Sequence, residues 1–161
     1  MRTLNILVTL LIGCFIIGCG SKEPAVSTYA FYTYEAECLG TNHDGSQTLL
    51  VWGTGKSPKE ASAAAVKEAV FTIMFKGINK GIGDCSAKPL VNKPNADKTY
   101  QVYLNSLLSN KSFYKKIVKG VEGHDAAKAH NGLYKVGQVV HIDVPALRQQ
   151  LINDGIISTT H

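Results

Sequence analysis

The stretch that most constrains the fold of this chain is residues 48–78, TLLVWGTGKSPKEASAAAVKEAVFTIMFKGI. Residues 48–54 form an apolar run with the length of a buried strand. Ser57 is a favourable helix N-cap, Pro58 suits the first helical position, and Glu60 stands where a capping box requires it. The stretch therefore predicts a strand, a tight glycine turn and a long helix.

The predicted helix carries small residues on one face and bulky residues near its end. Ala61, Ala65 and Ala69 recur at a spacing of four, which places them on one side of a helix. Such small side chains allow a helix to approach a sheet closely. Phe71 and the apolar residues after it add bulk, and Gly77 provides the expected end of the helix.

The turn between strand and helix is a partial match to a phosphate-binding loop. A P-loop requires G-x-x-x-x-G-K-[ST], so that backbone N–H groups surround the phosphates. The first glycine of that pattern would fall at position 50, which is Leu50. We therefore interpret the segment as a structural turn and not as a nucleotide site. An alternative is that the helix N-terminus binds another anion, with a candidate site at Gly53, Gly55, Lys56 and Ser57.

The rest of the chain is predicted to alternate between β-rich and helical segments. Alternating apolar residues, Asn-Gly turns and helix-starting prolines define the boundaries. The expected elements are a strand over 28–40, a hairpin loop over 41–47, a long loop over 84–99, a short helix over 100–111, β structure over 112–122, a polar segment over 123–131, a strand over 133–144 and a last helix from Pro145 to Gly155.

This order predicts an α+β fold, in which an antiparallel sheet has one long and one or two short helices packed on one face. Trp52 is expected in the core with Tyr29, Tyr32 and Tyr34, because aromatic residues in strands beside a helix are usually buried. The alternative is that these aromatic residues line a glycan- or peptide-binding surface.

The amino terminus resembles a bacterial lipoprotein signal. Residues 4–18 are almost wholly apolar, too short for a confident membrane span, and followed by Cys19. The resemblance implies cleavage before Cys19 and attachment of lipid to it. Because Gly20 stands where an aspartate would favour the inner membrane, the resemblance also implies the outer membrane. A plain signal peptide with an incidental cysteine is the alternative.

The expected domain organisation follows from this signal. It comprises a lipoprotein signal peptide over 1–18, a lipidated tether over 19–28 and a single α+β domain over 29–161. The last segment has an ordinary length for one domain. Acyl chains on Cys19 would hold that domain at a membrane without a spanning helix.

Two cysteines remain once Cys14 has left with the signal and Cys19 is acylated. Because an exported chain reaches an oxidising compartment, a disulfide between Cys38 and Cys85 is expected. Two buried free thiols are the alternative. No CxxC spacing is present in the sequence, so a metal-binding or catalytic cysteine pair is not expected.

Charge and motifs limit the chemistry that this chain is expected to perform. The 17 basic and 12 acidic residues are scattered, and an exported chain without an aromatic–basic motif is not expected to bind nucleic acid. No GxSxG motif occurs, and no catalytic residue and no cofactor is predicted. A weak alternative is a metal site formed by His124, His130, His141 and Asp143.

Residues 33–144 resemble the small LPP-type outer-membrane lipoproteins and the N-terminal domain of the flagellar T-protein. The features that carry the resemblance are a strand running into Gly53 and Gly55, the alanine spacing of the helix, a loop rich in glycine and proline, and the closing sequence LYKVGQVVHIDVPALRQQL. The resemblance implies a non-catalytic envelope domain of α/β sandwich type that makes protein contacts.

The sequence therefore predicts a lipid-anchored cell-envelope protein, not an enzyme, that acts as a binding or scaffold module in the periplasm or at the outer membrane. Its expected partners are the membrane, through the anchor at Cys19, and an envelope protein. Two alternatives stay open: a metal-binding or hydrolytic envelope protein that uses the histidines, and a surface-exposed lipoprotein that contacts a host.

Overall fold

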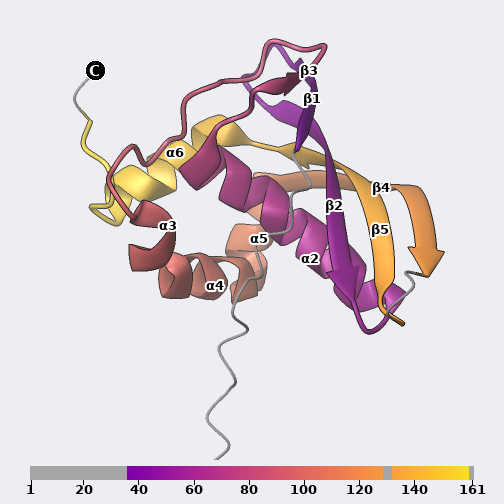
Figure 1. The fold of residues 1–161 in the computed structure, drawn as a ribbon. Coiled ribbons are helices and arrows are strands. Elements are labelled where there is room, and N and C mark those ends of the chain that lie inside the picture. Colours follow the sequence, from indigo (N-terminus) through magenta and orange to yellow (C-terminus); the bar gives the residue numbers. More distant parts are fainter. Residues whose placement is uncertain (1–35, 129–131, 160–161) are drawn as a thin grey trace, which may run out of the picture. The chain divides into compact units, whose positions relative to one another are not determined.

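The structure is a computed structural model that describes residues 36–128 and 132–159 (Figure 1). It combines a five-stranded sheet with helices, so the predicted α+β class is confirmed. In chain order the elements are β1 (Glu37–Thr41), β2 (Gln47–Gly55), α2 (Pro58–Phe71), the π-helix η1 (Thr72–Lys76), β3 (Lys80–Gly81), α3 (Ala96–Thr99), α4 (Gln101–Ser109), α5 (Lys111–Ile117), β4 (Val118–Lys128), β5 (Tyr134–Ile142) and α6 (Val144–Asn153).

The sheet has the strand order β3-β1-β2-β5-β4. The strand pairs β1–β2, β2–β5 and β5–β4 are antiparallel. The pairing of β2 with β5 runs without a break from Gln47↔Ile142 to Gly55↔Tyr134. The sheet is antiparallel as predicted except at one edge, where the two-residue strand β3 runs parallel to β1 and makes the sheet mixed. So short a strand leaves no periodicity in the sequence, because its pairing depends on contacts with distant residues.

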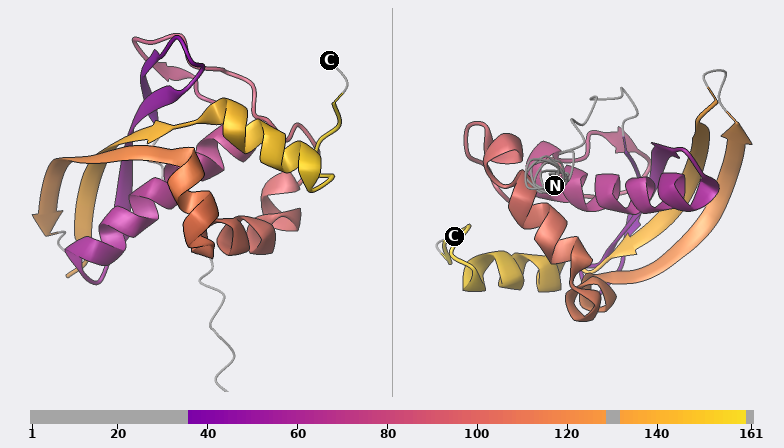
Figure 2. Two further views of the ribbon diagram at one scale, coloured as in Figure 1. Left: turned by 180° about the vertical axis from the view of Figure 1, so that it is seen from behind. Right: turned by 90° about the horizontal axis from the view of Figure 1, so that it is seen from below.

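Helix α2 lies against one face of the sheet, and the sheet curves around it (Figure 2). Leu49 and Val51 of β2 are fully buried beneath the helix. At Gly53 a Cβ would collide with the backbone of Ala61 and Ala65, which are themselves fully buried. Glycine on the strand and alanine on the helix thus allow the two backbones to approach closely, as the sequence predicts.

The long helix ends in a π-helical turn that holds the following loop. Gly77, with a φ of 77°, ends the helix at the predicted residue. The carbonyls of Ile73 and Met74 accept hydrogen bonds from the N–H groups of Leu90 and Val91, at 3.0 and 2.9 Å. The long loop predicted from the sequence is therefore held against the end of the helix by backbone hydrogen bonds.

A disulfide joins Cys38 of β1 to Cys85, the pair that the sequence analysis expects, with a Cα–Cα distance of 5.8 Å. Gly81, with a φ of 115°, lies against the backbone of Cys38, where a Cβ would not fit. The carboxylate of Asp84 accepts the N–H of Thr41 at 3.1 Å. We call the region formed by β1, β3 and residues 82–85 the stapled corner.

The prediction of β structure over 112–122 is wrong in its first half, which forms α5. The side chain of Asn110 caps this helix by accepting the N–H groups of Ser112 and Phe113, at 3.0 and 3.2 Å. Phe113 and Ile117 stand four residues apart and are both buried, which is the spacing of one helix face. The cap and this spacing outweigh the β propensity of the aromatic and β-branched residues.

Strand β4 extends to Lys128 through most of the segment 123–131 that the sequence analysis expects to be a polar connection, because β5 supplies backbone partners. The expected closing strand and helix are present as β5 and α6. Asp143 caps α6 by accepting the N–H of Ala146 at 2.8 Å. Gly155, with a φ of 69°, follows the end of the helix.

Several predictions lie outside the described residues. They are the signal peptide over 1–18, the tether over 19–28 with the acylated Cys19, and the strand residues before position 36 with their three tyrosines. The described residues all fall within one compact unit. No helix within residues 36–128 and 132–159 is long and apolar enough to cross a membrane.

Candidate functional site

Alternate residues of β2 and β5 point away from α2 and form the second face of the sheet. These positions in β2 are partly exposed, whereas Leu49 and Val51 between them are fully buried. Residues paired directly in an antiparallel ladder share a face, so the register assigns residues of β5 and β4 to the same side. Among the described residues, no helix covers this side (Figure 2). We call this surface the outer face; its residues are Thr48, Leu50, Trp52, Glu122, Lys135, Val139 and His141.

Trp52 provides the largest side chain of the outer face. Its ring lies across Gly137, where a Cβ would stand 2.8 Å from the ring. The ammonium of Lys135 is 4.6 Å from the ring centroid. Leu50 and Val139 are directly paired beside Trp52, and both are partly exposed. The expectation that Trp52 belongs to the core is therefore wrong, because its position in β2 points away from α2.

His141 adds a polar group next to this apolar centre. Its Nδ1 lies 2.9 Å from the hydroxyl of Thr48, and its Nε2 lies 3.5 Å from a carboxylate oxygen of Glu122. Because the Glu122 side chain is 72% exposed, solvent weakens this contact. The outer face thus has an apolar centre with polar and charged groups around it, which is the usual composition of a protein-binding surface.

Two of the four candidate metal ligands have side chains that the structure describes, and each has local partners. Asp143 caps α6 and also lies 3.2 Å from the ammonium of Lys119, while His141 makes the contacts given above. His130 lies outside the described residues, and the side chain of His124 is likewise not described. Within the described part of the chain, no group of three or more His, Cys, Asp or Glu residues could hold a metal ion.

The candidate anion site is built as a strand end followed by a helix cap. Gly53 and Gly55 face the backbone of α2 at contact distance. The hydroxyl of Ser57 accepts the N–H of Glu60 at 3.2 Å, and the Glu60 carboxylate accepts the N–H of Lys56 at 2.9 Å. This reciprocal capping engages backbone donors that an anion would use, so the geometry supports the structural interpretation. Anion binding stays a prediction.

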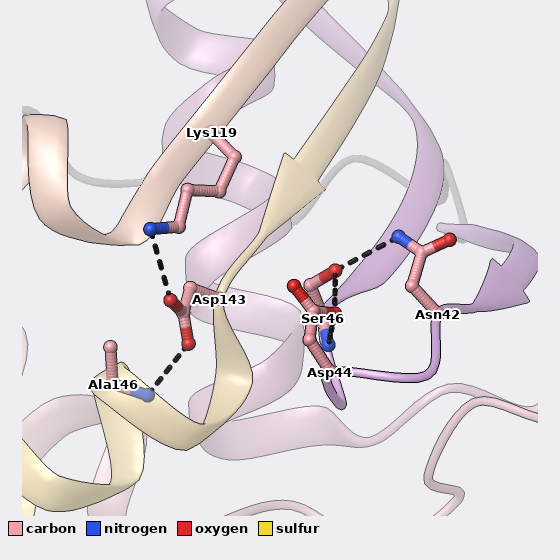
Figure 3. Close-up of polar contacts among 6 residues, drawn as sticks. All are labelled: Asn42, Asp44, Ser46, Lys119, Asp143 and Ala146. Atoms are coloured by element: carbon pink, nitrogen blue, oxygen red, sulfur yellow. Dashed lines mark hydrogen bonds and ion pairs between the residues drawn. The ribbon is translucent and has the colours of Figure 1, made fainter.

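Figure 3 shows a polar cluster where the hairpin loop between β1 and β2 lies near the start of α6. The Asp44 carboxylate accepts the hydroxyl and the N–H of Ser46, at 2.7 and 2.9 Å, and Asn42 donates to the Ser46 hydroxyl at 2.8 Å. The hydrogen bond from the Ser46 hydroxyl is the main reason that the pKa of Asp44 is lowered. Lys119 and Asp143 form an ion pair nearby. The hydrogen bonds among Asn42, Asp44 and Ser46 stabilise the loop through local partners.

The sequence analysis singled out Trp52 and His141 but did not join them into one surface. The signal that could have joined them is the alternation along β2 and β5, because the residues between the buried positions of paired strands must share the opposite face. What the alternation alone does not supply is the strand order. That order places β4, with Glu122, beside β5.

Comparison of the chain with protein-family models, with curated proteins and with solved structures finds no significant match. The resemblance to envelope lipoproteins therefore rests on the residues of this chain alone.

Proposed function

We propose that this chain is a lipid-anchored, non-catalytic binding module of the bacterial cell envelope, which holds an envelope protein against the outer face of its sheet. The lipid anchor at Cys19, and its placement at the outer membrane, are supported by the signal sequence. The observation that carries the binding role is the partly exposed apolar surface of Leu50, Trp52 and Val139 on a face that no described helix covers.

The physical argument for binding concerns the state of Trp52 before a partner arrives. Tryptophan is enriched among the residues that contribute most to protein interfaces. Its ring already lies against Gly137 and close to the ammonium of Lys135. A side chain ordered in this way loses little conformational freedom on binding, which reduces the entropic cost of association.

Site-specific photocrosslinking in the envelope tests the binding role. A photoactivatable amino acid at position 139, on the outer face, is expected to give a discrete protein adduct. The matched control is position 102 on α4, where Val102 is 76% exposed, and no adduct is expected there. In the chain with the photoactivatable residue at position 139, Trp52→Ser should reduce the yield of the adduct without changing the expression level. Equal adducts at both positions, or none at position 139, would contradict the binding role.

The anchor is tested separately by metabolic labelling with palmitate. The wild-type chain should incorporate the palmitate label and fractionate with the outer membrane. Cys19→Ser should abolish the label, because this residue is the proposed site of acylation. Label that persists in this variant would show that lipid, if present, is attached elsewhere.

A further inference from the structure

The stapled corner presents two aliphatic side chains to solvent. Ile82 is 95% exposed and Leu39 is 40% exposed. Strand β1 runs parallel to β3 with Cys38 paired to Gly81, the last residue of β3, and Leu39 and Ile82 are the residues that directly follow this pair. The N–H of Ile82 donates to the carbonyl of Cys38 at 3.1 Å, which confirms that the two segments are in contact at this point.

The backbone holds Ile82 in this exposed position. Gly81 lies against the backbone of Cys38, and Gly83 lies so close to Gly40 that a Cβ would stand 2.6 Å from its nitrogen. The disulfide at Cys85 fixes the chain just beyond. Exposure of an aliphatic side chain on a segment that is fixed in this way is not a consequence of a loosely held loop.

The corner also lies where the described chain begins, at Ala36 and Glu37. Residues 20–35 connect this point to Cys19, and even fully extended they reach at most roughly 60 Å. A tether of this length keeps the local concentration of the membrane high, on the order of millimolar, so a contact too weak to act in free solution can be occupied. Of the surfaces that the structure describes, the corner is joined to Cys19 by the shortest stretch of chain.

We propose that the stapled corner inserts Ile82 and Leu39 into the interface of the phospholipid bilayer and so fixes the orientation of the domain on the membrane. This inference rests on the proposed tether at Cys19. The acyl chains on Cys19 hold the chain at the membrane, and the interfacial contact fixes which side of the domain faces the bilayer.

The charged residues of the corner indicate which kind of lipid is sufficient for its contact with the bilayer. Glu37 and Lys80 are directly paired across β1 and β3, so opposite charges face each other. Asp84 adds a second negative charge, so the corner has two acidic residues and one basic residue. Because the corner carries no excess of positive charge, the contact is expected on vesicles of neutral phosphatidylcholine and does not require an anionic headgroup.

Quenching by brominated lipid tests the contact. The chain from Cys19 onward contains every described residue, and Cys19 is its only thiol outside the disulfide. It is coupled through Cys19 to a maleimide lipid in phosphatidylcholine vesicles brominated on the acyl chains. In Ile82→Trp the added fluorophore should be quenched at least about twofold more than in Val102→Trp, because only the corner enters the interface. Val102 is the matched control, since it is exposed on α4, away from β3 (Figure 1).

The wild-type chain, coupled to the same vesicles, reports the signal of Trp52, which is subtracted. Leu39→Ser on the Ile82→Trp background should reduce the quenching, because the two aliphatic residues insert together. Equal quenching at positions 82 and 102, or none at either, would overturn the inference and would indicate that the corner meets protein or solvent. Because the lipid is coupled chemically, this result is independent of palmitate labelling in cells, and the two proposals can fail separately.

Discussion

Glycine permits close backbone contact in two regions of this molecule, and the two regions are ordered by different means. Beneath α2, Gly53 lies against Ala61 and Ala65, and the surrounding side chains are fully buried. In the stapled corner, Gly81 lies against Cys38, yet Ile82 beside it is 95% exposed. Burial of apolar area orders the first region, whereas a disulfide and backbone hydrogen bonds order the second.

The difference shows how a small domain can keep side chains available while holding the backbone still. Residues under α2 contribute to stability through their side chains, so they are not free to serve as contacts. In the corner the stabilising groups are the Cys38–Cys85 bond and backbone donors such as the N–H of Ile82. The side chains there can therefore be selected for a contact with another surface.

Removal of the disulfide should have the largest effect, since the corner has little burial to replace it. Cys38→Ala combined with Cys85→Ala is expected to lower the free energy of unfolding by about 4 kcal/mol, from the loop that the bond closes. Urea unfolding measures this change. The wild-type chain in reductant should match the double variant, and an unchanged urea midpoint in the double variant would contradict the role assigned to the bond.

Close packing under α2 should give the next largest effect. Gly53→Ala places a methyl group against the backbone of Ala61 and Ala65 and is expected to cost about 3 kcal/mol by overpacking. The matched control is Gly123→Ala in β4, where a Cβ meets nothing within 4 Å and the change should stay within about 0.5 kcal/mol. Similar unfolding midpoints for the two variants would show that the helix can move away from the sheet without loss of stability.

A polar contact between α4 and the end of α6 should give a smaller, pH-dependent effect. The hydroxyl of Tyr103 donates to the Asp154 carboxylate at 2.6 Å, and Tyr103→Phe should cost about 1 kcal/mol. Burial, followed by this hydrogen bond, raises the pKa of Tyr103. The folded state therefore keeps the phenol neutral after the unfolded chain ionises, so this contribution is complete below pH about 10 and is lost as the pH rises further.

Urea midpoints at neutral and alkaline pH check the tyrosine contribution. The wild-type chain should lose stability above pH about 10, and Tyr103→Phe should lose less over the same interval because it lacks the titrating group. Parallel pH profiles for the two proteins would show that other groups cause the alkaline decline.

Substitution of Ile82, in the stapled corner, should have the smallest effect on stability. Ile82→Ser is expected to change the free energy of unfolding by less than about 0.5 kcal/mol, because the side chain is already in solvent. Ile73, which is 4% exposed, is the internal reference, and Ile73→Ala should cost about 3 kcal/mol. Thermal unfolding of the two variants provides the measurement; a large loss for Ile82→Ser would show that this residue supports the fold.

Local signals in the sequence predicted the strand, the capped helix and its end at Gly77, since each depends on neighbours within a few residues. The π-turn was not predicted, because its carbonyls are satisfied by Leu90 and Val91 from a distant loop. For the same reason β4 was predicted too short: its partners come from β5. Helix α5 had a local signal, the cap at Asn110, which the β propensity of its residues concealed.

The candidate site was predictable in parts. Alternation along β2 indicates two faces, but Trp52 was assigned to the core because aromatic residues in strands beside a helix are usually buried. The sequence does not state which of the two faces the helix covers. The two candidate metal ligands with described side chains, His141 and Asp143, have contacts with Thr48, Glu122 and Lys119 that arise from pairing and capping. Those contacts become visible only when the strand order is known.

The position of β1 inside the sheet has a mechanical consequence. A pull on the chain from its amino-terminal side enters the fold through β1, which lies between β3 and β2 and not at an edge. Edge strands can be peeled away one hydrogen bond at a time, whereas β1 is paired on both sides and cross-linked through Cys38 to Cys85. Force from a membrane tether would thus be shared among three strands and a covalent bond before any element could detach.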